Sequence, residues 1–254
     1  MQTKMAGRLA KTALLVAFGC TSFAHAAGTR WSVGVGAGVS SELYKDTDYT
    51  TGTTVVGGYE GDYVYFRGRE LGYRVLPQDS VQNFSLRLIY DGRHFDPSDS
   101  DDRQMRELDK RHATGLIGPK YELRLPLGKL EVGAAIEFTG EHDGYMAHAG
   151  WSYPMIAGPW GIIPGVGYEY NSSKMTNYLY GVSAGEASRS GLDQYDPDGA
   201  GQFYVGVNGF FHLSDSVRLD AGLRLTSYDS EIKDSPMVSH GENVAFFTAA
   251  SYLF

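Results

Sequence analysis

Apolar and polar residues alternate one by one in this sequence over stretches of about ten residues. Between Trp31 and Val39, the apolar residues are separated only by serine and glycine. The same period recurs at 130–138 and 217–225 and, less regularly, at 84–91, 117–125, 203–211 and 244–254. A period of two residues is typical of β-strands with one apolar and one polar face. Strands of about ten residues suit a tilted crossing of a bilayer, whereas soluble strands usually have about five or six.

The pattern predicts twelve strands. They cover residues 30–40, 53–60, 62–67, 69–76, 82–92, 114–125, 129–140, 145–156, 160–170, 201–213, 217–226 and 243–254. Ten strands is the alternative, because 62–67 and 69–76 alternate least regularly.

The predicted connections are asymmetric. Those after even-numbered strands are short, at residues 61, 77–81, 126–128, 157–159 and 214–216. The long ones, 41–52, 93–113, 171–200 and 227–242, all follow odd-numbered strands. Short periplasmic turns and long extracellular loops are typical of outer-membrane barrels, and an even strand count returns both termini to the periplasmic side.

The chain ends with an aromatic pair, Tyr252 and Phe254, on the outward face of the last predicted strand. A terminal phenylalanine with an aromatic residue two positions earlier resembles the signal that the barrel-assembly machinery reads. Hydrocarbon cannot satisfy an open sheet edge, so strands that cross outer-membrane lipid must close into a barrel. We therefore predict an all-β fold: a transmembrane antiparallel up-and-down β-barrel in the bacterial outer membrane.

The first 26 residues form a predicted signal peptide, which leaves residues 27–254 for the barrel. Lys4, Arg8 and Lys11 precede a mostly apolar stretch that ends at the cleavage motif 24–26. Lipidation at Cys20 is a weaker alternative, because the position three residues earlier is alanine and not leucine. Cleavage leaves a chain without cysteine that has 19 Lys and Arg against 30 Asp and Glu, or about −11, because three of the 22 cations are removed.

Composition excludes other classes of protein. The longest apolar run, 13–20, has eight residues, whereas a spanning helix needs roughly 18 or more. The 13% of aromatic residues argues against disorder, and a net charge of −8 argues against a nucleic-acid partner.

The polar faces of the predicted strands supply a charged lumen. Its residues are Arg74, Arg87, Asp91, Lys120, Glu122, Arg124, Glu131, Glu137, Glu169, Arg218, Asp220 and Arg224. Twelve strands enclose less space than a sixteen-stranded porin, and opposite charges can pair across that width. The sequence thus favours a narrow or plugged interior.

Two groups of residues offer catalytic or metal-binding alternatives. His212 and Ser214 have the spacing of barrel lipid hydrolases, yet the predicted topology places them at a periplasmic turn. The acidic run 96–102, with His94, offers an omptin-like protease site or calcium ligands, but it lacks the glycine spacing of a preformed calcium loop. Asp196–Gly199 is interpreted as a turn. We predict no enzyme activity, no cofactor and no metal.

Several motifs resemble the MipA/OmpV family of outer-membrane proteins over nearly all of the mature chain. They are Trp31-Ser-Val-Gly-Val-Gly-Ala37, Gly61-Asp-Tyr-Val-Tyr-Phe-Arg-Gly-Arg-Glu-Leu-Gly72, Asn177-Tyr-Leu-Tyr-Gly-Val-Ser183 with Glu186-Ala187, Ser190-Gly191 and Tyr195, then Asp234-Ser-Pro-Met-Val238 and Tyr252-Leu-Phe254. The motif loop is defined by its most specific residues: Asn177, Tyr178, Tyr180, Gly181, Glu186, Ser190 and Gly191.

The resemblance implies an outer-membrane barrel without catalytic residues. For the family's founding member it also implies a scaffold that brings a periplasmic murein transglycosylase and a murein synthase together. Three functions stay open for this chain: such a scaffold, a narrow channel for small solutes, and a lipid hydrolase. Because the predicted periplasmic turns are short, we expect the glycine-containing loop 171–200 to fold inward and shape the lumen, and not to contact murein enzymes.

Overall fold

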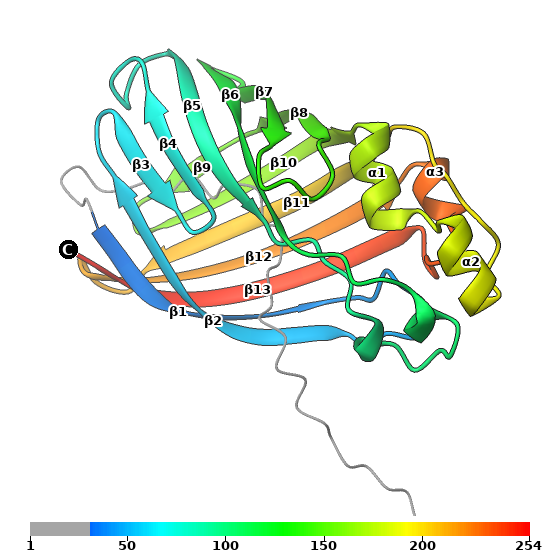
Figure 1. Cartoon of the computed structure of the whole chain (residues 1–254). Coiled ribbons are helices and arrows are strands. Elements are labelled where there is room, and N and C mark those ends of the chain that lie inside the picture. Colours follow the sequence, from blue (N-terminus) through cyan, green and yellow to red (C-terminus); the bar gives the residue numbers. More distant parts are fainter. Residues whose placement is uncertain (1–30) are drawn as a thin grey trace, which may run out of the picture.

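The computed structural model describes residues 31–254, so the predicted signal peptide and residues 27–30 lie outside the described part of the chain. Within that part, no helix is long and apolar enough to cross a membrane. The structure consists mainly of antiparallel strands that enclose one central space, with three short helices gathered at one end (Figure 1).

Thirteen strand segments occur in residues 31–254. They are β1 (Trp31–Ser40), β2 (Thr50–Glu60), β3 (Val64–Arg67), β4 (Glu70–Arg74), β5 (Gln82–Asp91), β6 (Thr114–Leu125), β7 (Gly128–Glu137), β8 (Tyr145–Ser152), β9 (Met155–Ala157), β10 (Trp160–Asn171), β11 (Ala200–His212), β12 (Val217–Tyr228) and β13 (Glu242–Leu253). Proline interrupts one predicted strand, because β8 and β9 flank Tyr153-Pro154 and pair one after the other with β10. Counted as one, they give the twelve predicted strands.

The sheet closes on itself. β13 pairs with β1, and β10 pairs along its full length with β11. Every strand pair is antiparallel, so the up-and-down barrel predicted from the sequence is confirmed. The C-terminus lies at the end of the barrel opposite the three helices (Figure 1). By the rule for outer-membrane barrels, the end with the short turns faces the periplasm.

The two faces of the wall follow the predicted alternation. Apolar side chains such as Val33, Leu86 and Leu223 are exposed on the outside, where they contact lipid. Charged side chains such as Arg87, Lys120 and Asp220 are buried inside. Exposed aromatic rings lie near strand ends, at the headgroup level that suits them. They include Trp31, Tyr145, Trp151, Tyr153, Trp160 and Tyr168.

The β3–β4 hairpin is much shorter than its neighbours. β3 pairs with β2 only over Gly58–Glu60, and β4 pairs with β5 over 85–89. Its turn contains Gly68 at φ +59°, a left-handed conformation that glycine adopts without strain. In Figure 1, β3 and β4 are short arrows between long β2 and β5. The hairpin therefore fills only the periplasmic part of the wall between these two strands.

The long loops fold together into a cap over the extracellular mouth. The cap contains α1 (Ser173–Tyr180), α2 (Ala184–Ser190), α3 (Ser230–Lys233) and two 3-10 turns, Pro97–Asp99 and Met105–Glu107. α1 buries Met175, Leu179 and Tyr180 in a cluster with Leu116, Ala135 and Met146 of the barrel strands. A second cluster joins three loops through Phe95, Met105, Leu108, Val182, Leu192 and Met237.

Burial of these side chains holds the cap in place. A fully buried leucine or methionine contributes roughly 1.5–3 kcal/mol relative to an exposed one. Met175, Met105 and Met237 are completely buried. The loop 172–199 thus packs on the barrel through α1, as an inward-folding loop would, while Ser183 and Ser188 on its other side are exposed.

Candidate functional site

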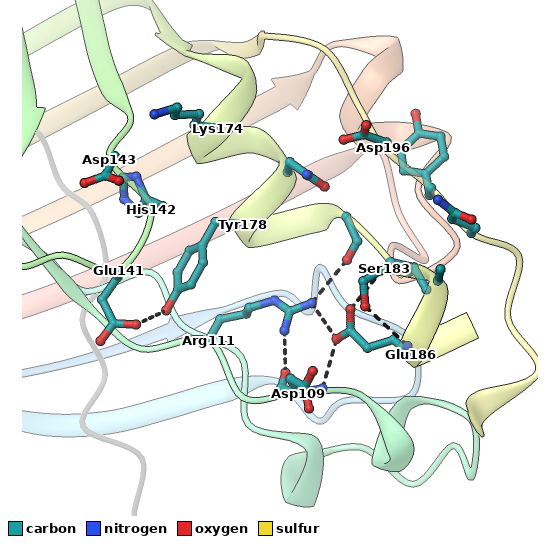
Figure 2. Close-up of a pocket in the computed structure, with 16 residues that line it drawn as sticks. Asp109, Arg111, Glu141, His142, Asp143, Lys174, Tyr178, Ser183, Glu186 and Asp196 are labelled. Atoms are coloured by element: carbon teal, nitrogen blue, oxygen red, sulfur yellow. Dashed lines mark hydrogen bonds and ion pairs between the residues drawn. The ribbon is translucent and has the colours of Figure 1, made fainter. Parts of the chain in front are cut away.

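A pocket of about 670 Å³ opens within the cap, on the extracellular side. Four segments build it: the 92–113 loop, the β7–β8 loop, α1, and residues 181–196, which include α2 (Figure 2). Most of its lining residues are polar or charged: Asp109, Arg111, Glu141, His142, Asp143, Lys174, Asn177, Tyr178, Ser183, Glu186, Gln194 and Asp196. We call this cavity the outer pocket.

A buried ion pair lies at its inner wall. Arg111 Nη2 donates to Glu186 Oε1 at 2.7 Å and to the Gly181 carbonyl at 3.2 Å. Arg111 Nη1 donates to the Asp109 carbonyl at 2.9 Å, and Glu186 Oε1 also accepts from the Asp109 N–H at 3.0 Å. The pair therefore joins the 92–113 loop to α2 (Figure 2).

Glu186 also starts helix α2. Its Oε2 accepts from the Ser183 N–H at 2.9 Å, and the Ser183 hydroxyl accepts from the Glu186 N–H at 3.3 Å, which forms a capping box. Burial opposes ionisation of Glu186, but the N–H groups of Asp109 and Ser183 and the Arg111 guanidinium lower its pKa to about 2. The helix ends at Gly191, at φ +77°.

Tyr178 connects a third segment to the outer pocket. Its hydroxyl donates to Glu141 Oε2 at 3.0 Å and accepts from the His112 N–H at 2.6 Å. Its ring lies 5.2 Å from the His142 ring, measured between centroids. Burial, together with the Glu141 carboxylate, raises the pKa of Tyr178. The tyrosine therefore remains protonated and acts as a hydrogen-bond bridge between loops.

The lining of the outer pocket supports binding better than catalysis. Ser183 is the serine that lines the pocket, and its hydroxyl is engaged in the capping box. His142 is the histidine that lines the pocket, and its Nδ1 accepts a hydrogen bond from the Gly144 N–H at 3.0 Å. Burial lowers the pKa of His142, which favours the neutral ring. Among the described residues, no group of three or more His, Cys, Asp or Glu side chains is arranged to hold a metal ion.

The structure brings most of the motif loop to one place. Asn177, Tyr178, Gly181 and Glu186 line the outer pocket. Tyr180 is buried toward the barrel instead. Ser190 and Gly191 lie at the end of α2, where the Ser190 hydroxyl accepts from the Leu192 N–H at 3.1 Å. Gly181 makes a close approach: a Cβ there would lie 1.8 Å from Asn177 Oδ1.

The partner of Glu186 was not anticipated from the sequence. Arg111 lies at the end of a loop with many charges, and its nearest neighbours in sequence are Lys110 and His112. The sequence of this run does not indicate which of its arginines is buried. The buried neighbours Met105 and Leu108 were the available signal that this loop packs against something.

The residues behind the hydrolase and calcium hypotheses have ordinary structural roles in the fold. Ser214 lies in a periplasmic turn, where its hydroxyl accepts from the Val217 N–H at 3.1 Å. Asp96 caps a 3-10 turn, and the Lys110 ammonium and Ser98 lower its pKa to about 2. Asp102 accepts from two backbone N–H groups of the next turn. Asp96 and Asp102 therefore form hydrogen bonds within their own loop.

A network of buried charges occupies the lumen beside β3–β8. The Tyr65 ring lies at its centre, with the Arg74 guanidinium 4.2 Å and Lys120 Nζ 5.1 Å from the ring centroid. Glu60 pairs with Arg74 at 2.8 Å, and Glu70 pairs with Lys120 at 2.7 Å. Further members are Arg67, Arg87, Glu122, Lys129, Glu131 and His148. Opposite charges therefore pair inside the barrel, as predicted.

Two other sets of charged side chains pair inside the barrel. Arg218 pairs with Asp220 at 2.7 Å on the β12 side. Arg93 enters below the cap and pairs with Asp91 at 2.7 Å and with Glu169 at 3.1 Å. Arg93 was not among the predicted lumen residues, because it follows the end of a strand and enters from the loop.

The fold and the site define the class: a bacterial outer-membrane β-barrel with paired charges inside and a folded extracellular cap. The chain belongs to the MipA family, because the family model described as "MltA-interacting protein MipA" matches residues 33–254. The MltA-interacting protein of Escherichia coli K12 is 32% identical, covering 91% of this chain and 92% of that protein. The outer membrane protein OmpV of Vibrio cholerae is 24% identical, covering 89% and 87%. The names of these relatives indicate non-enzymatic proteins.

Among solved structures, the chain is similar to the translocator domain of the autotransporter NalP from Neisseria meningitidis, with 11% identity, 89% coverage of both chains and a TM-score of 0.48. It is also similar to an outer membrane channel from Pseudomonas putida F1, with 11% identity, coverage of 93% and 100%, and a TM-score of 0.47.

The predicted assembly signal lies at the periplasmic end of the barrel. Tyr252 and Phe254 are both exposed, and their rings meet edge to face with centroids 5.0 Å apart. The Phe254 N–H donates to the Trp31 carbonyl at 3.0 Å, which secures the closing strand against β1. Recognition of these rings by the assembly machinery stays a prediction.

Proposed function

We propose that this protein is a non-enzymatic anchor in the outer membrane that holds a periplasmic murein transglycosylase close to its substrate. The observation that carries the proposal is the match, at 32% identity and over nearly the whole chain, to a protein named for its interaction with MltA. The buried ion pairs inside the barrel and the folded cap support it, because they suit a rigid platform better than a wide pore.

The periplasmic rim supplies a surface for such a partner. Three of its turns carry an exposed aspartate, Asp62, Asp79 and Asp215. No lysine or arginine occurs in the rim segments 61–63, 75–81, 126–127, 153–154, 158–159 and 213–216. Leu127 and Leu213 are strongly exposed on the same rim. This combination fits a basic partner with an apolar patch, and turns from several hairpins together must supply the roughly 800 Å² of a stable interface.

The test measures binding of a purified lytic murein transglycosylase to the full-length protein in nanodiscs. We expect the triple variant Asp62→Lys, Asp79→Lys, Asp215→Lys to bind at least tenfold more weakly, because the charge of the rim is reversed. The matched control reverses three exposed extracellular aspartates: Asp48→Lys, Asp99→Lys and Asp193→Lys. Wild-type binding by the rim variant, or equal loss in both triples, would contradict docking at the rim.

A second candidate, a narrow channel for small solutes, is favoured by one observation. Inward positions of β1 are small, because they are occupied by Gly34, Gly36 and Gly38. A passage along β1 would run past these glycines. Steady single-channel conductance of the full-length protein in a planar bilayer, reduced by Gly36→Leu, would support this function.

A further inference from the structure

Within residues 31–254, the outer half of β2 has β1 as its one neighbouring strand. β2 pairs with β1 along Thr50–Tyr59 but with β3 only over Gly58–Glu60. The last contact on that side is the bond from the Gly68 N–H to the Gly57 carbonyl, at 3.1 Å. Among the described residues, no strand pairing covers the other edge of Thr51–Val55.

The geometry identifies which backbone groups face this open edge. In an antiparallel strand, alternate residues direct their N–H and C=O to opposite neighbours. Because Gly57 faces β3, the residues Val55, Thr53 and Thr51 face the same way, and Thr54 and Val56 face β1. The Thr54 hydroxyl donates to the Val55 carbonyl at 3.3 Å, so one acceptor of the edge is partly satisfied.

The open edge borders the part of the wall between β2 and β5 that the short hairpin does not fill, which we call the window. The hairpin turn bounds it below, where the Tyr90 N–H donates to the Arg69 carbonyl at 2.9 Å. The 92–113 loop bounds it above, through the Thr47–Ser100 bridge and the bond from the Asp101 N–H to the Asp46 carbonyl at 2.8 Å. Figure 1 shows this loop passing from β5 toward the outer end of β2.

The surroundings of the window are amphipathic. Its edge carries threonine at 51, 53 and 54, and Thr51 and Thr53 stand on the lipid-facing side, where other strands have mostly apolar residues. Beside them, Val55 is 75% exposed, and Phe66, Leu71 and Tyr90 are exposed on the neighbouring segments. Backbone groups without a partner cost several kcal/mol each in hydrocarbon. Whatever lies at this edge must therefore hydrogen-bond to it.

We propose that the edge Thr51–Val55 binds a lipid of the outer leaflet that carries amide and hydroxyl groups next to its acyl chains. Such groups both donate and accept, so they match the N–H and C=O pairs of the edge, and the acyl chains lie against Val55, Phe66 and Leu71. The window opens in the outer half of the wall, toward that leaflet. Exposed apolar residues, Val55, Phe66 and Leu71, lie beside the edge on the lipid-facing surface, which favours lipid as the occupant.

The first test is residue-resolved amide exchange of the full-length protein in nanodiscs, made of phosphatidylcholine alone or with lipid A, which has amide-linked hydroxyacyl chains. We expect the amides of Thr51, Thr53 and Val55 to exchange at least tenfold more slowly with lipid A. The amides of Thr54 and Val56, which face β1, serve as the internal control and stay equally slow in both. Equal exchange of the edge amides in the two nanodiscs, fast or slow, would overturn the proposal.

A pair of proline variants tests the edge itself. Proline removes an N–H and is accepted in a strand only where that N–H is unpaired. Thr53→Pro should fold with a heat-modifiable yield close to wild type, whereas Thr54→Pro should lose most of it because its N–H faces β1. Equal loss in the two variants would show that Thr53 is paired and that the edge is not open.

Discussion

Replacing Glu186 by glutamine should release the cap near α2 without unfolding the barrel. Removing one member of a buried ion pair costs about 3–5 kcal/mol, because the remaining charge loses its partner. Arg111 keeps the carbonyls of Asp109 and Gly181, so we expect about 3 kcal/mol, the lower end of that range. This value corresponds to an increase of about 100-fold in the opening equilibrium of α2.

Amide exchange in α2 measures that opening. The informative amides are those of Ala187 and Gly191, which donate to Ser183 and Ala187 inside the helix. Glu107→Gln is the matched control, because it makes the same chemical change on an exposed side chain of the neighbouring loop, with an expected effect within about 0.5 kcal/mol. Unchanged exchange in Glu186→Gln would refute the role of the Arg111–Glu186 pair.

The same pair predicts how the cap responds to acid. The pKa of Glu186 is lowered to about 2 in the folded cap, so its contribution is complete above the ordinary pKa of 4.5. This contribution to the stability of the folded cap, about 3 kcal/mol in total, is lost as the pH falls from 4.5 toward 2. After correction for intrinsic exchange rates, protection of α2 should fall over this window in the wild type. The fall should be much smaller in Glu186→Gln.

Four further variants test the barrel. Arg218→Leu should lower the free energy of unfolding by about 3–5 kcal/mol in urea titrations from lipid, because it leaves a lumen carboxylate unpaired. Ala221→Arg on the lipid face should lower it by about 2–4 kcal/mol if the position lies at mid-bilayer. Tolerance of both substitutions would show that the two faces are assigned the wrong way round. Gly72→Ala places a Cβ 2.1 Å from Tyr65 Cζ, so it should cost about 1–3 kcal/mol by the same titration. Deleting Phe254 should reduce heat-modifiable, membrane-inserted protein while export continues, and normal insertion would count against the assembly signal.

The strand framework could be predicted because alternation is local. In a barrel, each residue contacts either lipid or the lumen, so the period of two appears directly in the sequence. The predicted segment 114–125 coincides with β6. Pro154 divides the predicted segment 145–156 into β8 and β9, since it cannot donate to the ladder.

The cap and the window could not be predicted from such a pattern. Contacts between Arg111 and Glu186, or between Tyr178 and His112, join loops far apart in sequence, and no period marks them. The short hairpin had the weakest alternation of all the predicted strands. Its length decides whether the edge of Thr51–Val55 is covered, and that length depends on where β3 turns, at Gly68.

The inward folding of the loop 172–199 has a direct test: the labelling of single cysteines by a membrane-impermeant biotin maleimide in whole cells. Ser183 and Ser188 are exposed, so labelling there would occur in a packed cap as well as in an open loop. Thr176 discriminates, because it lies in α1 and is completely buried. We predict full labelling of Ser188→Cys and protection of Thr176→Cys until the protein is denatured. Rapid labelling of Thr176→Cys in intact cells would contradict a cap that closes the extracellular mouth.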